Sequence, residues 1–201
     1  MSTVKSKKLQ VGTDANSANN FTLYQPATPD GTLRIGVGNA ENPTEVGQFN
    51  ANGYKPTTFP TFRARMSSSQ TLSASTETLM QFDTTDWDTT NGDFDTTTYS
   101  YTPSIAGYYQ VNAQILFNTG IADQKQTWVK LNKNGSSYCI GSVTNTSGTN
   151  DQCTPVVSTL VYLNGTTDYI GIYGRHGDSA SRTVSNASHL TNWTCYLVQP
   201  A

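Results

Sequence analysis

The stretch that decides the fold is residues 101–118, which read YTPSIAGYYQVNAQILFN. From Tyr109 to Phe117 every second side chain is apolar, and the amides of Gln110, Asn112 and Gln114 lie between them. A period of two is typical of a strand that buries one face. We therefore predict a central strand over residues 107–118.

The same period extends along the rest of the chain, and no heptad or amphipathic 3.6-residue stripe of useful length accompanies it. The pairs Asn134-Gly135 and Asn164-Gly165 favour tight hairpin turns between the runs. The spacing is typical of an all-β sandwich. The predicted strands of this sandwich are residues 61–68, 78–83, 93–101, 107–118, 126–135, 154–163, 168–174 and 190–199.

The composition agrees with strands and excludes several classes of function. Charged residues make up 13% of the chain, against about 25% in ordinary globular proteins. The net charge is −2 and no basic stripe is present, which argues against nucleic-acid binding. No apolar run approaches the roughly 20 residues needed to span a bilayer. The first residues lack the apolar segment of a signal peptide, so we expect a protein made in a cytoplasm and not inserted in a membrane.

The chain contains three cysteines, Cys139, Cys153 and Cys195. They show no metal-ligand spacing such as C-x2-C. An odd count without an export signal favours reduced, packed thiols. A bridge between Cys139 and Cys153 across a loop remains open at this point.

Two prolines, Pro56 and Pro60, bracket a connector that divides the chain into residues 1–58 and residues 59–201. The first part is a β-rich leader with a turn at residues 29–31. Its short strands carry few apolar residues and could hardly be stable alone. We expect this leader to pair with neighbouring copies or to lie on another protein.

The second part resembles the globular head domain of the complement first component, which shares its jelly-roll fold with the tumour necrosis factor family. Residues 62–64 match the family's Phe-x-Ala, and residues 101–109 resemble its signature of an aromatic residue, Thr, Pro, Gly and Tyr in that order. Residues 131–135 resemble its Leu-x-x-Asn-Gly turn. Residues 193–197 stand where the family has Phe-x-Gly-x-Leu, with Cys195 in place of the glycine. The resemblance implies a homotrimeric jelly roll.

The leader carries a second resemblance. Its phrases GTLRIGVGN (residues 31–39) and VGQFNANG (residues 46–53) resemble short β-segments of bacteriophage tail-fibre and virion proteins. This implies a virion structural protein made in the host cytoplasm, whose residues 1–58 attach to other virion proteins. The trimeric knob would be a tail-fibre tip for host-surface attachment or a head decoration.

In a homotrimeric virion protein of this kind, two groups of residues are candidates for contacts. Strand aromatic and aliphatic residues would build the core or the trimer interface, because tyrosine rings are usually buried while their hydroxyls reach a partner. These residues are Phe62, Tyr101, Tyr108, Tyr109, Val111, Phe117, Trp128, Tyr169, Trp193 and Leu197. Residues of the polar loops 142–152 and 174–186, together with Tyr138, would contact a host glycan or protein. The candidates there are Tyr138, Asn145, Asn150, Arg175, His176 and Arg182.

The aspartates of residues 82–95 raise the question of a calcium site. An EF-hand loop needs ligands at positions 1, 3, 5 and 12 with glycine at 6. Counting from Asp86 puts Asp88 at position 3 but Thr90 at 5 and Thr97 at 12, so the pattern fails. We predict that the aspartates cap turns. Asp86, Asp88 and Asp93 are the only weak candidates for calcium, and no other cofactor is indicated.

Other classes of function fit less well. The chain has two histidines, His176 and His189, and no Gly-x-Ser-x-Gly, so a polysaccharide hydrolase lacks an identifiable triad. We expect no enzyme. A secreted ligand-type module of the complement and tumour necrosis factor superfamily remains the alternative, and it predicts a signal sequence and paired cysteines.

Overall fold

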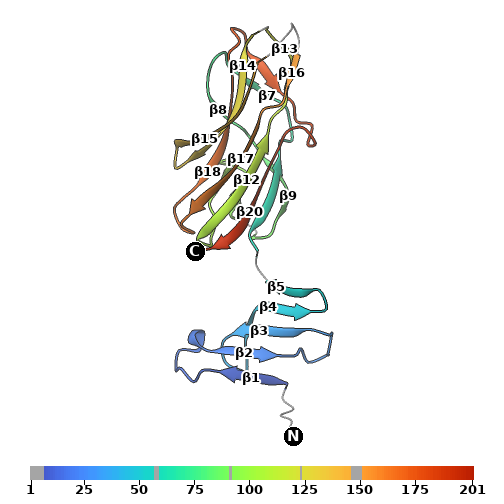
Figure 1. The fold of residues 1–201 in the computed structure, drawn as a ribbon, viewed down its shortest axis with the longest axis vertical. Coiled ribbons are helices and arrows are strands. Elements are labelled where there is room, and N and C mark those ends of the chain that lie inside the picture. Colours follow the sequence, from blue (N-terminus) through green and yellow to red (C-terminus); the bar gives the residue numbers. More distant parts are fainter. Residues whose placement is uncertain (1–6, 57–58, 91, 123, 146–150) are drawn as a thin grey trace. The chain divides into compact units, whose positions relative to one another are not determined.

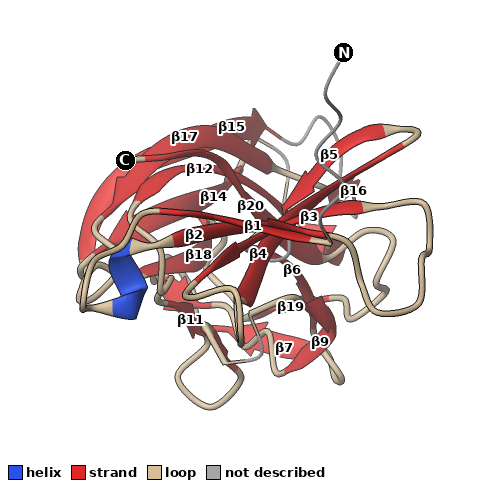
Figure 2. Ribbon diagram, turned by 90° about the horizontal axis from the view of Figure 1, so that it is seen from below, coloured by secondary structure: helices blue, strands red, loops and turns tan. Residues whose placement is uncertain are grey.

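The structure is a computed structural model that describes residues 7–56, 59–90, 92–122, 124–145 and 151–201. The chain divides into two compact units, Met1–Phe59 and Pro60–Ala201. Throughout the described residues both units are built from antiparallel strands (Figure 1). The one helical element among them is a short 3₁₀ turn, η1, at Ser17–Asn19, drawn in blue in Figure 2.

The first unit is a five-stranded sheet whose strands pair in sequence order. Gly31 (φ 78°) and Gly53 (φ 108°) take the left-handed backbone that their turns require. The strands are β1 (Lys8–Val11), β2 (Phe21–Tyr24), β3 (Leu33–Val37), β4 (Thr44–Asn50) and β5 (Gly53–Pro56).

One face of this sheet is apolar and uncovered within the unit. Leu9 pairs with Leu23, and Leu23 pairs with Ile35, so these side chains share a face. In the neighbouring row Phe21 is 49% exposed. Every buried apolar side chain of the described residues lies in the second unit. The described residues of the first unit therefore form a hydrophobic face but no hydrophobic core.

The second unit is a sandwich of two main sheets with a smaller sheet at one end. The first main sheet has the order β17 (Val156–Leu163), β12 (Gly107–Gln114), β20 (Asn192–Pro200), β6 (Thr61–Arg65) and β9 (Thr84–Asp88). The second has the order β10 (Phe94–Asp95), β11 (Ser100–Tyr101), β18 (Ile170–His176), β14 (Gln126–Lys133) and β15 (Ser136–Asn145), and β8 (Thr78–Leu79) also pairs with β18. The small sheet is β16 (Asp151–Cys153), β13 (Phe117–Ile121), β19 (Arg182–Val184) and β7 (Gln70–Leu72).

The core lies between the two main sheets and is rich in aromatic rings. The Phe62 ring centroid is 5.0 Å from that of Trp193 and 4.6 Å from that of Tyr101. Phe94 and Phe82 pack against Trp193 from other sides. Because such edge-on aromatic pairs add to the area that each ring buries, this cluster holds the sheets together.

The alternation that predicted the central strand is confirmed, since its apolar positions from Tyr109 to Phe117 are all buried. The predicted strand over residues 107–118 is, however, two strands. β12 ends at Gln114, and β13 begins at Phe117 in the small sheet. The chain thus changes sheets at Ile115 and Leu116 while it keeps its inner face in the core.

Several other boundaries differ from the prediction. Residues 93–101 were predicted as one strand, but β10 and β11 are separated by a turn in which Asp95 accepts hydrogen bonds from the backbone N–H groups of Thr97 and Thr98. β9 forms among the aspartates that were predicted as turns. β15 runs on to Asn145 into the predicted loop 142–152, and residues 146–150 of that loop lie outside the described residues.

The cysteines stay apart from one another. Cys195 is buried in the core, and Cys153 is buried in the small sheet. Cys139 carries a free thiol, so the bridge to Cys153 that the sequence left open is not formed.

Candidate functional site

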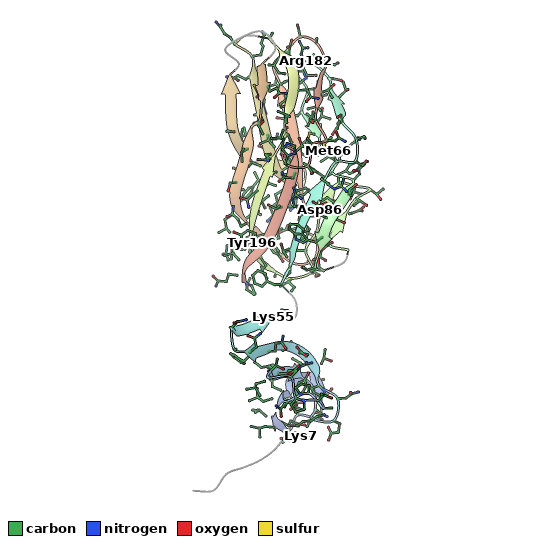
Figure 3. All side chains as sticks on the ribbon, turned by 90° about the vertical axis from the view of Figure 1, so that its right-hand side faces the viewer. Lys7, Lys55, Met66, Asp86, Arg182 and Tyr196 are labelled. Atoms are coloured by element: carbon green, nitrogen blue, oxygen red, sulfur yellow. The ribbon has the colours of Figure 1, made fainter. Side chains whose placement is uncertain are left out.

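The most prominent surface feature of the sandwich is the outer side of β17, β12 and β20, which lie side by side in Figure 1. Register places Tyr162 beside Tyr108, and the two ring centroids are 5.5 Å apart. In the next row Leu160 lies beside Gln110, which in turn lies beside Tyr196, a residue labelled in Figure 3. One end of this surface is therefore dominated by large apolar and aromatic side chains.

These side chains are exposed in the single chain. Leu160 is 46% exposed and Tyr108 is 45% exposed. Patches of contiguous exposed apolar residues mark interaction surfaces. We call this surface the apolar face and define it as Tyr108, Tyr138, Ile140, Val156, Leu160, Tyr162, Tyr196 and Val198.

The strand β17 gives the clearest indication that this surface is buried against another protein surface. Its inward residues Val157 and Val161 are buried in the core. Its outward residues Val156, Leu160 and Tyr162 are also apolar, although they face outside. A strand that is apolar on both faces is typical of one that is covered on both faces. Among the described residues, only the inner face of β17 is covered.

The apolar face continues from β17 onto β15 because the two strands approach closely at the edge of the sandwich. The hydroxyl of Tyr138 donates a hydrogen bond of 3.0 Å to the carbonyl of Leu160. A Cβ at Gly141 would lie 2.2 Å from the carbonyl oxygen of Val156, so only glycine permits this approach. Tyr138 and Ile140 are thereby placed next to the outward side chains of β17.

The centre of the surface is polar but uncharged. Ser158 donates a hydrogen bond of 2.8 Å to Oδ1 of Asn112, and Gln110 donates to both of these side chains. The charges lie at the edges: Asp86 forms ion pairs with Arg63 and Arg65 at the β6–β9 edge, and Lys133 Nζ lies 5.6 Å from the Tyr162 ring centroid at the β17 edge. Depletion of charge at the centre with charges at the rim is typical of protein interfaces.

Most residues predicted for the core or interface are buried in the chain's own core and so cannot offer their side chains to a partner. These are Phe62, Tyr101, Tyr109, Val111, Phe117, Trp193 and Leu197. Tyr108 lies on the apolar face. Trp128 and Tyr169 lie on the outer side of the other main sheet, where the guanidinium of Arg175 is 4.3 Å from the Trp128 ring centroid.

Sequence reasoning favoured the core or interface for the strand tyrosines, Tyr162 and Tyr196 among them, but it missed Val156 and Leu160, although a signal for both was present. The run VVSTLVYL is apolar at both even and odd positions. Such a run indicates a strand that is covered on both faces.

The predicted recognition residues are not gathered in one place. Tyr138 lies on β15 rather than in a loop, Asn145 ends that strand, and Asn150 lies outside the described residues. Arg182 forms a hydrogen-bonded ion pair of 2.7 Å with Asp178, which orients its side chain toward its own chain.

His176 was predicted as a loop contact, and this is wrong. It ends β18 and is fully buried, with Nε2 3.2 Å from the carbonyl of Leu72. Its Nδ1 accepts a hydrogen bond from the backbone N–H of Asp178, and its ring packs against Phe117. The histidine is a structural residue of the core.

The aspartates that were weak calcium candidates all bind protein donors. Asp86 pairs with arginines, and Asp93 accepts hydrogen bonds from the backbone and hydroxyl of Ser104. Burial alone would raise the pKa of Asp88, but hydrogen bonds from Thr90, Gly92 and Phe94 together lower it. Among the described residues no group of three His, Cys, Asp or Glu is arranged to hold a metal ion. No helix in the described part of the chain is long and apolar enough to cross a bilayer.

No protein-family model and no curated protein matches the chain. Its structure is similar to that of the tumour necrosis factor Eiger from S. frugiperda, with a TM-score of 0.52 and 11% identity over 71% of this chain and 93% of that chain. It is similar to the globular domain of zebrafish complement 1qA, with a TM-score of 0.52 and 14% identity over 71% and 99% of the two chains. Murine APRIL gives a TM-score of 0.53 and 10% identity over 70% and 100%. At these identities the likeness establishes the fold, which is a jelly-roll sandwich of the tumour necrosis factor and complement type.

Proposed function

We propose that this chain is a virion structural protein of a bacteriophage and forms a homotrimeric knob on the particle. Residues 59–201 form the knob, and residues 1–58 attach it to other virion proteins. The knob acts by binding, either as a tail-fibre tip that attaches to a host-surface glycan or protein or as a head decoration. The protein is an adhesive and mechanical part and not an enzyme.

The observation that carries this proposal is the apolar face. The apolar face spans strands of both main sheets and continues into an uncharged polar centre. A second and a third copy of the same surface supply the missing cover in a closed ring, which leaves no face open for further growth.

The placement on a bacteriophage particle is supported by the first unit. Its apolar sheet face, with Leu9, Phe21 and Leu33 each about half exposed, has no cover within the unit. Its phrases at residues 31–39 and 46–53 resemble β-segments of tail-fibre and virion proteins. A sheet of this kind becomes stable when it is laid against another protein or another copy.

The decisive experiment is the mass of the full chain in solution by sedimentation or light scattering. We expect three times the chain mass of 21.8 kDa. The change Leu160→Glu places a charge on the apolar face and should give a species of one chain mass. Tyr169→Glu changes a residue of similar exposure on the other main sheet and should leave the trimer intact. A stable lone subunit of the unmodified chain contradicts the proposal.

The location on the particle is tested separately by electron microscopy of particles labelled at Ala201. Label on the tail supports the fibre tip, and label on the capsid supports the head decoration. Purified particles without label contradict the virion assignment. That result would favour the second candidate, a ligand-type binding module, for which the likeness to Eiger, complement 1qA and APRIL is the supporting observation.

A further inference from the structure

A pocket of about 310 Å³ opens on the outer side of the second main sheet. It lies within the second unit, on the sheet opposite the one that carries most of the apolar face. Its size falls at the small end of the roughly 300–1,000 Å³ that is usual for small-molecule sites. The lining residues are Leu79, Thr98, Ser100, Thr102, Asn132, Gly135, Tyr169, Gly171 and Tyr173.

The wall of this pocket contains a buried amide oxygen without a hydrogen-bond partner. Asn132 points outward from β14 but is only 7% exposed, and its Oδ1 accepts no hydrogen bond. Buried polar atoms in native proteins are nearly always hydrogen-bonded, so such an exception indicates a role for the group. The last side-chain torsion of asparagine is roughly two-fold, so a half-turn about it exchanges the two amide atoms and presents either one to the pocket.

The aromatic part of the rim is held in place by the neighbouring turn. Asn134 accepts a hydrogen bond of 2.9 Å from the backbone N–H of Tyr169 and donates its own backbone N–H to the carbonyl of Tyr169 at 2.9 Å. The side chain of Asn134 also donates to Asp168, which pairs with Lys133. The Tyr169 backbone is thus fixed from both sides, while its side chain remains 42% exposed at the pocket.

The floor is kept open by a glycine. A Cβ at Gly171 would lie 3.3 Å from the Leu79 side chain and 3.7 Å from the Tyr173 ring, and so would fill the space between them. Opposite it, the hydroxyls of Thr98 and Ser100 are 2.8 Å apart. The pocket therefore offers two tyrosine rings, an amide and several hydroxyls around a vacant floor.

Charge is absent from the lining. Of the ionic groups next to it in the sheet, Lys130, beside Tyr173, forms an ion pair with Glu77, and Lys133 pairs with Asp168. Asp95, opposite Ser100 on the neighbouring strand, accepts hydrogen bonds from the backbone N–H groups of Thr97 and Thr98. An anion or a cation would find no opposite charge in this pocket. A purely apolar ligand would leave Oδ1 of Asn132 without a partner, which is unfavourable.

We propose that this pocket binds one neutral sugar ring. A sugar ring presents hydroxyls at its edge and C–H groups on its faces, which matches an amide and hydroxyls beside a tyrosine ring. The amide of Asn132 bonds neighbouring sugar hydroxyls, and the ring of Tyr169 covers one sugar face. The site lies within a single chain, so this inference goes beyond the proposed trimer and does not depend on it.

The test is saturation-transfer difference NMR on the full chain, with the methyl glycosides of glucose, galactose and mannose, N-acetylglucosamine, and glucuronate as a charged comparison. We expect saturable binding of at least one neutral sugar with a Kd on the order of 1 mM. Asn132→Leu should weaken it at least about tenfold while the thermal midpoint is unchanged or raised. A merely structural Asn132 would instead give a lowered midpoint and unchanged binding.

A second pair of variants keeps the test decisive if Asn132→Leu does not fold. Tyr169→Ala should abolish binding and leave the oligomeric mass unchanged. Tyr196→Ala removes a tyrosine of equal exposure, 42% in both cases, from the apolar face, and should weaken the oligomer and leave sugar binding unchanged. Binding of none of the neutral sugars, binding that survives Tyr169→Ala, or glucuronate binding as strong as that of glucose would each overturn the assignment.

Discussion

The two units of this chain use the same antiparallel strands in opposite ways. The second unit buries aromatic rings such as Phe62 and Trp193 between two sheets. The first unit buries no apolar side chain among its described residues and leaves one sheet face uncovered. The difference shows that regular strand pairing alone does not make a stable domain, because one sheet layer cannot remove its own apolar face from water.

Polar contacts take the place of a core in the first unit. The amide of Asn20 is buried, bonding Asp14 at 2.9 Å and Asn39 at 2.8 Å. Arg34 bridges Asp30 and Glu45 across the sheet. Such contacts fix the shape of turns and the register, but exposed ion pairs add little stability. The first unit therefore has a defined structure whose described residues bury polar rather than apolar side chains.

The largest effect is expected from separating the units. Residues 60–201 alone should unfold in one cooperative transition, because their core is complete. Residues 1–59 alone should show no cooperative transition in dilute solution, since they bury no apolar side chain. Circular dichroism during heating measures both fragments.

Repeating the measurement on residues 1–59 at several protein concentrations tests whether copies of this unit associate. If residues 1–59 gain a cooperative transition only at high concentration, copies of the first unit cover one another's apolar faces. A cooperative transition in dilute solution would contradict the view that this unit lacks a core.

A smaller effect should follow from matched phenylalanine changes. Phe62→Ala should destabilise the second unit by about 3–5 kcal/mol, the usual cost of removing a buried phenylalanine. Phe21→Ala, on the uncovered face of the first unit, should change the stability of the free protein by no more than about 0.5 kcal/mol. Urea unfolding of both variants provides the comparison, and similar losses would show that Phe21 is covered in solution.

Under the proposed virion role, Phe21→Ala should have a larger effect on the assembled particle. There Phe21→Ala should lower incorporation of the protein, because the face that carries Phe21 is then covered. Equal incorporation of the variant and the unmodified protein would place the attachment elsewhere in the first unit.

An element of this structure can be predicted from the sequence when its own residues specify it, and cannot when contacts with distant segments do. The strand that begins at Gly107 is predictable because its own alternation specifies its inner face. β9 is not, because its residues TTDWD contain one apolar side chain and it is held by pairing with β6. β15 was missed even though the Asn134-Gly135 turn was recognised, because its sequence SSYCIGSVTN has no regular alternation.

The apolar face and the pocket also differ in how far the sequence predicts them. The uncovered side of β17 could be read from its apolar residues alone. The pocket could not, because its lining comes from β8, β11, β14 and β18, and only the fold brings these segments together. The burial of His176 likewise depends on its contact with Leu72, which is distant in the sequence.

The smallest effect on stability should come from neutralising one carboxylate in each unit, Asp178 in the second and Asp30 in the first. Burial alone would raise the pKa of Asp178, but hydrogen bonds from Ala122, Arg182 and Ala180 lower it. In the first unit, bonds from Thr32 and Arg34 lower the pKa of the exposed Asp30 to about 2. Both folded-state values lie below the unfolded value of about 3.9, so both groups stabilise the fold above about pH 4, and this stabilisation is lost as the pH falls toward the folded-state value.

The two carboxylates should nevertheless differ when they are neutralised. Asp178→Asn should cost the sandwich about 1–3 kcal/mol at pH 7, because buried donors lose a charged acceptor, and should make its stability less dependent on pH below 4. Asp30→Asn should leave the transition of the sandwich unchanged at every pH. Thermal unfolding between pH 2 and pH 7 distinguishes the variants. An Asp178→Asn protein that loses stability in acid as steeply as the unmodified chain would show that other carboxylates control the acid unfolding of the second unit.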